Sequence, residues 1–166
     1  MNKKLIAMLI FMAPLALFAQ KFGHLNSADI IQVMPEYKTA QTEIQNLEKQ
    51  ISNELQMMES ELAKKSEAYE KEKATLPANI QQRREQELQD IYARMQQYYQ
   101  ESQQQLAQAS QEKMAAITTK VIDAIKAVGQ AGGYVYIMDI AGGVPYISTT
   151  LSTDVTADVK AKLGLK

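Results

Sequence analysis

The sequence predicts a mainly α-helical protein with a small β base: one long antiparallel helical hairpin on a short-stranded body. Residues 36–76 and 78–128 contain neither glycine nor proline and are rich in good helix formers. Only Pro77 separates them, and a proline removes a backbone donor and disfavours helix in the residue before it. Further on, residues 134–140 are aromatic and β-branched, which predicts a strand.

The two helical stretches are best explained as the arms of a hairpin. A short connection between long helices favours an antiparallel pair. We therefore expect a helical arm at residues 35–128 with its tip near 75–79. A single long helix kinked at Pro77 is the alternative.

Apolar residues in the first stretch follow an eleven-residue repeat: Leu55 lies eleven positions after Ile44, and Met58 lies eleven positions after Leu47. Such a repeat is typical of straight or slightly right-handed supercoils, so the helices should touch along a narrow seam. The second stretch is rich in glutamine and poor in apolar residues between Tyr99 and Met114, after which apolar residues return densely up to Val128. We therefore expect dense burial near the base and thin packing further out.

The N-terminus has the layout of a secretory signal peptide at residues 1–19. Lys3 and Lys4 precede the apolar run 5–18, and Ala19 offers a small residue at the cut. The run is short of the roughly 20 residues that a membrane span needs, although an uncleaved anchor is the alternative. A cleaved, exported and cysteine-free chain indicates the periplasm. Cleavage would shift the net charge from −1 to about −3, too mild an imbalance to favour nucleic acid.

The flanking residues 20–34 and 129–166 should form the β-containing body. We expect a strand at 21–26, then a brief helix capped by Asn26 or Ser27. Gly129 and the Gly132-Gly133 pair should end the long helix. The strand at 134–140 shows no polar alternation, so both of its faces should be covered.

The end of the body is predicted to be a hairpin followed by a helix. Gly142 and Gly143 should turn the chain so that residues 144–148 pair back on the preceding strand. A last helix should span 157–163. Because so small a sheet makes a poor monomer, we expect a closed homo-oligomer with a shared sheet or barrel. The candidate oligomerisation residues are apolar side chains of the two strands: Phe22, Leu25, Tyr134, Tyr136, Ile137, Met138 and Ile140.

We find no pattern of residues in the sequence that would support catalysis or the binding of a cofactor. His24 is the only histidine, cysteine is absent, and neither metal-ligand spacing nor a phosphate loop occurs. Arg83 and Arg84 form a small basic spot that we interpret as solvated helix surface. The prediction is therefore a protein without enzymatic activity, cofactor or metal.

Four segments of the mature chain resemble the Skp (OmpH-like) family of periplasmic chaperones. The likeness lies in their order and spacing rather than in one motif. The segments are residues 23–27 with 34–37, residues 55–62, residues 120–128 running into 134–139, and residues 154–159.

The resemblance implies a homotrimer with a small β-barrel body and three helical arms around a cavity. It also implies an ATP-independent holdase that keeps unfolded outer-membrane proteins soluble before insertion. Members of the family are often basic, whereas this mature chain is slightly acidic, so any membrane or lipopolysaccharide association should be weak. The alternative is a structural or adaptor coiled-coil protein that binds one folded partner.

The candidate client-contact residues are also candidates for the hairpin seam, and the sequence leaves the two roles open. They are the apolar and aromatic side chains of the arms: Leu47, Ile51, Leu55, Met57, Met58, Leu62, Tyr69, Leu88, Tyr92, Met95, Tyr98 and Tyr99.

Overall fold

A computed structural model describes residues 20–165 of the chain, so the predicted signal peptide lies outside the described residues. The described chain divides into two compact units. One unit, the base, comprises the described residues up to Met34 together with those from Thr118 onward. The other, the arm, comprises Pro35–Ile117. Helix α4 is continuous from Ala78 to Gly132 and contributes to both units.

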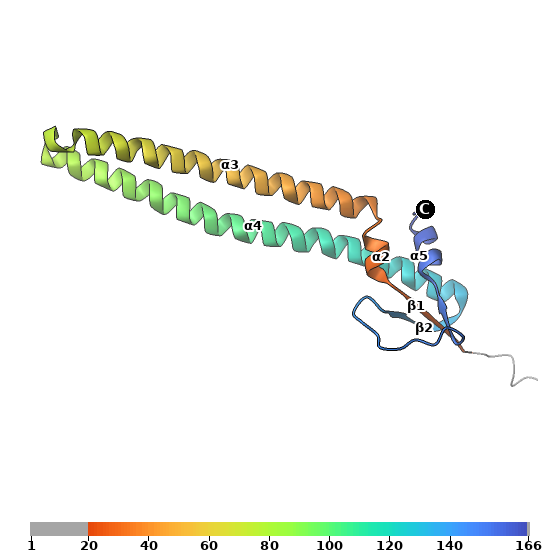
Figure 1. Cartoon of the computed structure of the whole chain (residues 1–166). Coiled ribbons are helices and arrows are strands. Elements are labelled where there is room, and N and C mark those ends of the chain that lie inside the picture. The colour runs from red at the N-terminus through yellow and green to blue at the C-terminus, as the bar shows by residue number, and fades with distance from the viewer. Residues whose placement is uncertain (1–19, 166) are drawn as a thin grey trace, which may run out of the picture. The chain divides into compact units, whose positions relative to one another are not determined.

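The arm is a helical hairpin, as the sequence predicts. Helix α3 (Pro35–Glu72) leads through a 3₁₀ turn, η2 (Lys73–Thr75), into α4, which returns alongside it (Figure 1). Pro77 lies just outside α4, and its carbonyl accepts the N–H groups of Ile80 and Gln81 at 2.9 and 3.0 Å. The alternative of one kinked helix is therefore wrong.

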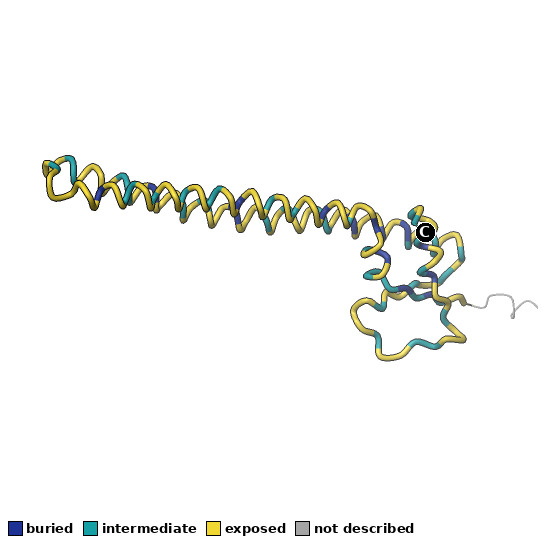
Figure 2. The backbone as a smooth tube through the Cα atoms, turned by 45° about the horizontal axis from the view of Figure 1, so that its top comes forward, coloured by how far each residue is buried: buried dark blue, intermediate teal, exposed yellow. Residues whose placement is uncertain are grey.

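The seam between the two helices keeps the eleven-residue repeat on both sides. Buried positions recur at Ala40 and Ile51 on α3, and at Ile91 and Ser102 on α4. Figure 2 shows buried segments, drawn in dark blue, at intervals along the arm. The Cα atoms of the two helices rarely come within 8 Å of one another. The seam is therefore made by side chains rather than by close backbone approach.

Burial on α4 is denser near the base, as expected, because buried residues stand three or four positions apart from Ile117 to Ala124 but eleven apart from Ile91 to Ser102. The outer part of the seam is nevertheless packed. Tyr69 and Ile91 lie in the outer half of the arm, yet they are only 5% and 2% exposed. The reason is that the repeat needs only one inward residue per turn, and the small Ser102 occupies that place where larger apolar residues are missing. The glutamines of α4 occupy the other faces of the helix, so their abundance does not weaken the seam.

The base contains a three-stranded parallel sheet with the N-terminal strand in the middle. Strand β1 (Lys21–Leu25) pairs with β2 (Tyr134–Asp139) on one side and with β3 (Ser152–Asp154) on the other. A parallel pair needs a long crossover connection, which here includes the whole arm. Strands β1 and β2 confirm the two predicted strands.

The predicted hairpin of residues 144–148 on β2 is wrong. The Gly143 N–H donates to Ile140 O at 3.0 Å, but the chain then continues as a loop to residue 151. Strand β3 pairs with β1 instead, because the second edge of β1 would otherwise lack partners for its backbone groups. His24 Nδ1 lies 2.8 Å from Ser152 Oγ and reinforces this pairing.

Two short helices cover the base and complete its core. Helix α2 (Ser27–Ile31) is capped by Asn26, whose side chain accepts the Ala28 N–H, as predicted. Helix α5 (Thr156–Lys162) packs against α2. The fully buried apolar side chains of the base come from the strands, the helices and their flanks: Leu25, Ile30, Met34, Val121, Val155 and Val159.

The long helix α4 ends three residues later than its first glycine. Gly129 lies inside the helix, which ends at Gly132, and Gly133 adopts a left-handed φ of 65°. A Cβ atom at position 132 would lie 2.4 Å from the Tyr134 ring, so only a glycine leaves room there for the Tyr134 side chain.

Candidate functional site

The described residues contain no cluster of three histidine, cysteine or carboxylate side chains that could hold a metal ion. His24 is engaged in the sheet through Ser152. Within the described chain, none of the helices has a stretch long and apolar enough to span a membrane.

One flank of the arm carries a continuous hollow, which we call the lateral groove. It consists of three overlapping hollows of about 320, 660 and 470 Å³. The first two share Glu48, and the second and third share Leu55 and Glu59. The groove therefore follows the hairpin from Tyr37 to the level of Tyr92, with both helices contributing its walls.

The floor of the lateral groove is apolar and partly accessible. Leu55 and Met95 are half-buried, while Tyr92 and Tyr99 stand 51% and 53% exposed on α4. Aromatic side chains with exposed faces supply large contact area at a low cost in conformational entropy. Large apolar side chains left open in this way are typical of an interaction surface.

The predicted client-contact residues separate into three groups. Ile51, Leu55, Tyr92, Met95 and Tyr99 line the lateral groove. Met57 is 58% exposed and lies outside the groove. The remaining candidates are buried or half-buried and fit the seam: Leu47, Met58, Leu62, Tyr69, Leu88 and Tyr98.

Sequence reasoning missed Tyr37, Leu106 and Met114, which also line the groove. The signal for Leu106 was present, because it lies eleven positions after Met95 and thus in the same place of the repeat. Tyr37 and Met114 stand near the ends of the arm unit, where apolar residues also fit the packed core of the base.

The base carries a second apolar surface on its edge strand. Val135, Tyr136 and Met138 of β2 are 58%, 51% and 42% exposed. The expectation that both faces of this strand are covered is therefore wrong for the single chain. In the described chain β2 pairs with β1 alone, so its outer edge is open.

The other predicted oligomerisation residues are less accessible. Phe22, Tyr134, Ile137 and Ile140 are half-buried, and the Phe22 ring lies 4.9 Å from that of Tyr136. Leu25 is fully buried inside its own chain, so it stabilises the base rather than offering a contact. Val135 and Tyr146 are exposed apolar residues that the prediction omitted.

A cluster of polar side chains near the tip of the arm joins α3 to α4. Lys65 of α3 pairs with Glu87 of α4, and the Tyr69 hydroxyl donates to Glu85 Oε1 at 2.5 Å. The bond from Lys65 lowers the pKa of Glu87. The bond to Glu85, aided by desolvation, raises the pKa of Tyr69 to about 12.

The raised pKa of Tyr69 predicts that its contact with Glu85 weakens at alkaline pH. The raised pKa of Tyr69 means that its contribution to stability is complete below the ordinary value of 10.0 and is lost as the pH rises through about 12. The contribution of Tyr69 to the tyrosinate absorbance is the part that is missing in the Tyr69→Phe variant. This part should therefore titrate near pH 12. In Glu85→Gln the same signal should move toward 10. A Tyr69 signal that titrates at its ordinary value in the unaltered chain would contradict the contact.

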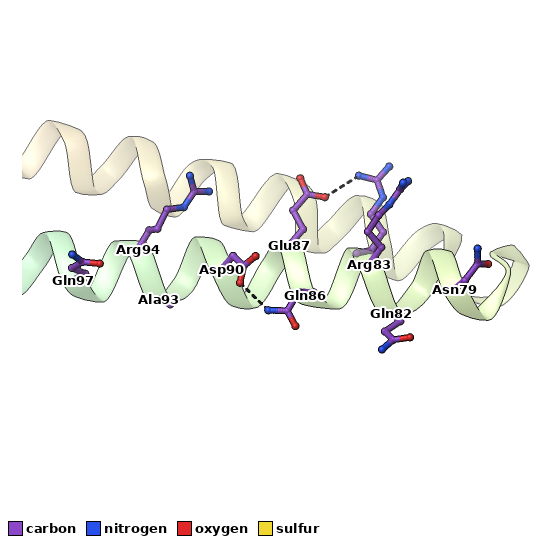
Figure 3. Close-up of a pocket in the computed structure, with 10 residues that line it drawn as sticks. Asn79, Gln82, Arg83, Gln86, Glu87, Asp90, Ala93, Arg94 and Gln97 are labelled. Carbon is purple, nitrogen blue, oxygen red and sulfur yellow. Dashed lines mark hydrogen bonds and ion pairs between the residues drawn. The ribbon is translucent and has the colours of Figure 1, made fainter.

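The basic spot at the tip is an open surface of one helix. A hollow of about 1180 Å³ is lined only by residues of α4, among them Arg83 and Arg94 (Figure 3). Arg84 Nη1 lies 3.3 Å from Glu87 Oε2, and Gln86 donates to Asp90. Acidic side chains therefore offset part of the positive charge, and no second element encloses the surface.

Comparisons with known proteins agree with this architecture. No curated protein matches the sequence. Among solved structures, the fold is similar to a protein from Caulobacter crescentus CB15 described as a candidate outer membrane chaperone (OmpH-like). The TM-score is 0.76, with 18% identity over 87% of this chain and 83% of that one. The model of the outer membrane protein (OmpH-like) family matches residues 21–163, so the chain belongs to that family.

Proposed function

We propose that this protein is an ATP-independent holdase that binds unfolded outer-membrane proteins between helical arms and prevents their aggregation before membrane insertion. The lateral groove carries the proposal: it is long, apolar at its floor and accessible along its length. Membership of the OmpH-like family and the described role of the Caulobacter protein support the same function.

The proposal includes a homotrimer assembled through the base. The exposed side chains of β2 and its open edge support this, because an unpaired strand edge invites another chain. Residues 20–34 and 129–166 would form the shared body and residues 35–128 the arms. Sedimentation at micromolar concentration should give the mass of three chains, and a monomer mass would rule out the shared body.

The proposed compartment is the periplasm, with residues 1–19 removed as a signal peptide near Ala19. Outer-membrane proteins pass through that compartment unfolded, and it lacks ATP. The slightly acidic mature chain and the partly offset basic spot at the tip give little attraction for lipopolysaccharide.

Aggregation of urea-denatured outer-membrane barrels on dilution tests the function. Near-equimolar trimer should suppress light scattering for several unrelated barrels without ATP. Tyr92→Ser with Tyr99→Ser should reduce this holding, because both exposed faces line the groove, whereas Met57→Ser should not.

The alternative is an adaptor that binds one folded partner. Its signature would be failure to hold any of the barrels together with tight binding of a single folded envelope protein. The exposed aromatic side chains of the lateral groove do not favour it, since an adaptor coil would be expected to bury such side chains between its helices.

A further inference from the structure

The walls of the lateral groove are rich in glutamine. Gln45 and Gln56 line it from α3, and Gln96 and Gln103 line it from α4. A glutamine amide both donates and accepts hydrogen bonds. Walls of this kind can pair with the N–H and C=O groups of any backbone laid between them, whatever its sequence.

The charges of the groove are biased toward the acidic. Glu48 and Glu59 are exposed and lie where adjacent hollows overlap. The one cation of the lining, Lys113, is paired with Glu43. A basic segment is therefore favoured in the groove, and an acidic one is repelled.

The length of the groove suits an extended chain. Its α3 wall runs from Tyr37 to Glu59, which corresponds to roughly 33 Å at the rise of an α-helix. An extended segment of about ten residues covers that distance. Alternate side chains of such a segment point to one face, which matches an apolar floor flanked by polar walls.

Building on the proposed chaperone function, we infer that the lateral groove binds an extended, uncharged or basic polypeptide segment of about ten residues. Its alternate apolar side chains lie on the floor formed by residues such as Leu55, Tyr92 and Tyr99, and its backbone pairs with the glutamine amides. Strand segments of unfolded barrels have this alternation. The carboxylates of Glu48 and Glu59 repel acidic segments and so weaken their binding.

Fluorescent ten-residue peptides test the inference with the purified full protein. The neutral probe alternates valine or tyrosine with threonine. Two further probes carry two lysines or two glutamates in place of threonines, and a fourth has alternate backbone nitrogens methylated. We expect the lysine probe to bind at least about fivefold more tightly than the glutamate probe at low salt. The methylated probe should bind more weakly than its parent because it lacks backbone donors.

Charge-reversed variants provide the matched control. Glu48→Lys with Glu59→Lys should invert the preference between the lysine and glutamate probes. Glu70→Lys with Glu101→Lys makes the same change in net charge outside the groove and should preserve the preference. Tyr92→Ser with Tyr99→Ser should lower the affinity for the neutral probe about tenfold, while Met57→Ser should leave that affinity unchanged.

The remaining outcomes separate the inference from the proposed function. If the barrels are held but the groove variants bind every probe like the unaltered chain, the inference is wrong and the holdase stands. If probe binding changes in the groove variants as expected but no barrel is held, the proposed clients are wrong. A change of assembly mass in the groove variants, with no probe bound, would make the groove an interface between copies and overturn the inference.

Discussion

Leu25→Ala is expected to lower the free energy of unfolding of the base by about 3 kcal/mol, within the range of buried leucine truncations. Leu25 is fully buried on the central strand β1, and the carbonyl of the same residue accepts the Ile140 N–H at 2.9 Å. A smaller side chain leaves a cavity where β1 meets the covering helices. Hydrogen exchange of the β1 and α5 amides should reveal the loss.

Leu151→Ala is the matched control for this substitution. Leu151 is 76% exposed on the loop before β3, so its truncation should change the same free energy by no more than about 0.5 kcal/mol. Equal effects of the two substitutions at one protein concentration would mean that Leu25 is not part of a packed core.

Ile91→Ala should loosen the arm by about 3 kcal/mol, measured as faster exchange of amides within residues 35–117. Ile91 is 2% exposed, and a two-helix seam has few other buried residues to share the loss. Because the helices meet only through side chains, the gap cannot be closed by a small backbone shift without disturbing neighbouring turns. Holding of barrels should fall as well, since the walls of the groove depend on the pairing of α3 with α4.

Ile122→Ala makes the same change on the same helix at a residue that is 44% exposed. It should leave exchange in the arm within experimental error. If both variants loosen the arm alike, the effect comes from helix α4 as such rather than from the seam.

The helices could be predicted because their causes are local. Long stretches without glycine or proline, broken once at Pro77, are enough to place α3 and the start of α4. The eleven-residue repeat of the first stretch also predicted seam positions such as Ile51 and Tyr69, which are buried. The buried Ser102 of α4 was not predicted, because a search for large apolar residues passes over a serine.

The sheet and the groove could not be predicted in the same way. The Gly142-Gly143 pair is a sound turn signal, yet the partner of the following segment depends on which edge of β1 is unpaired. That is decided by residues far apart in sequence. Likewise, Tyr98 and Tyr99 are neighbours with similar chemistry, but only Tyr99 lines the groove, because consecutive helical residues point in directions about 100° apart.

The position of β1 in the sheet also sets the order in which the molecule can be completed. Every strand partner of β1 lies far downstream: its contacts include His24 with Ser152, 128 positions later. When the chain emerges with its N-terminus first, β1 has no strand partner until the whole arm has emerged. The arm, with local helical contacts, can form during that interval, and the base closes last. The sheet can therefore be completed only after the chain has emerged as far as β3 (Ser152–Asp154).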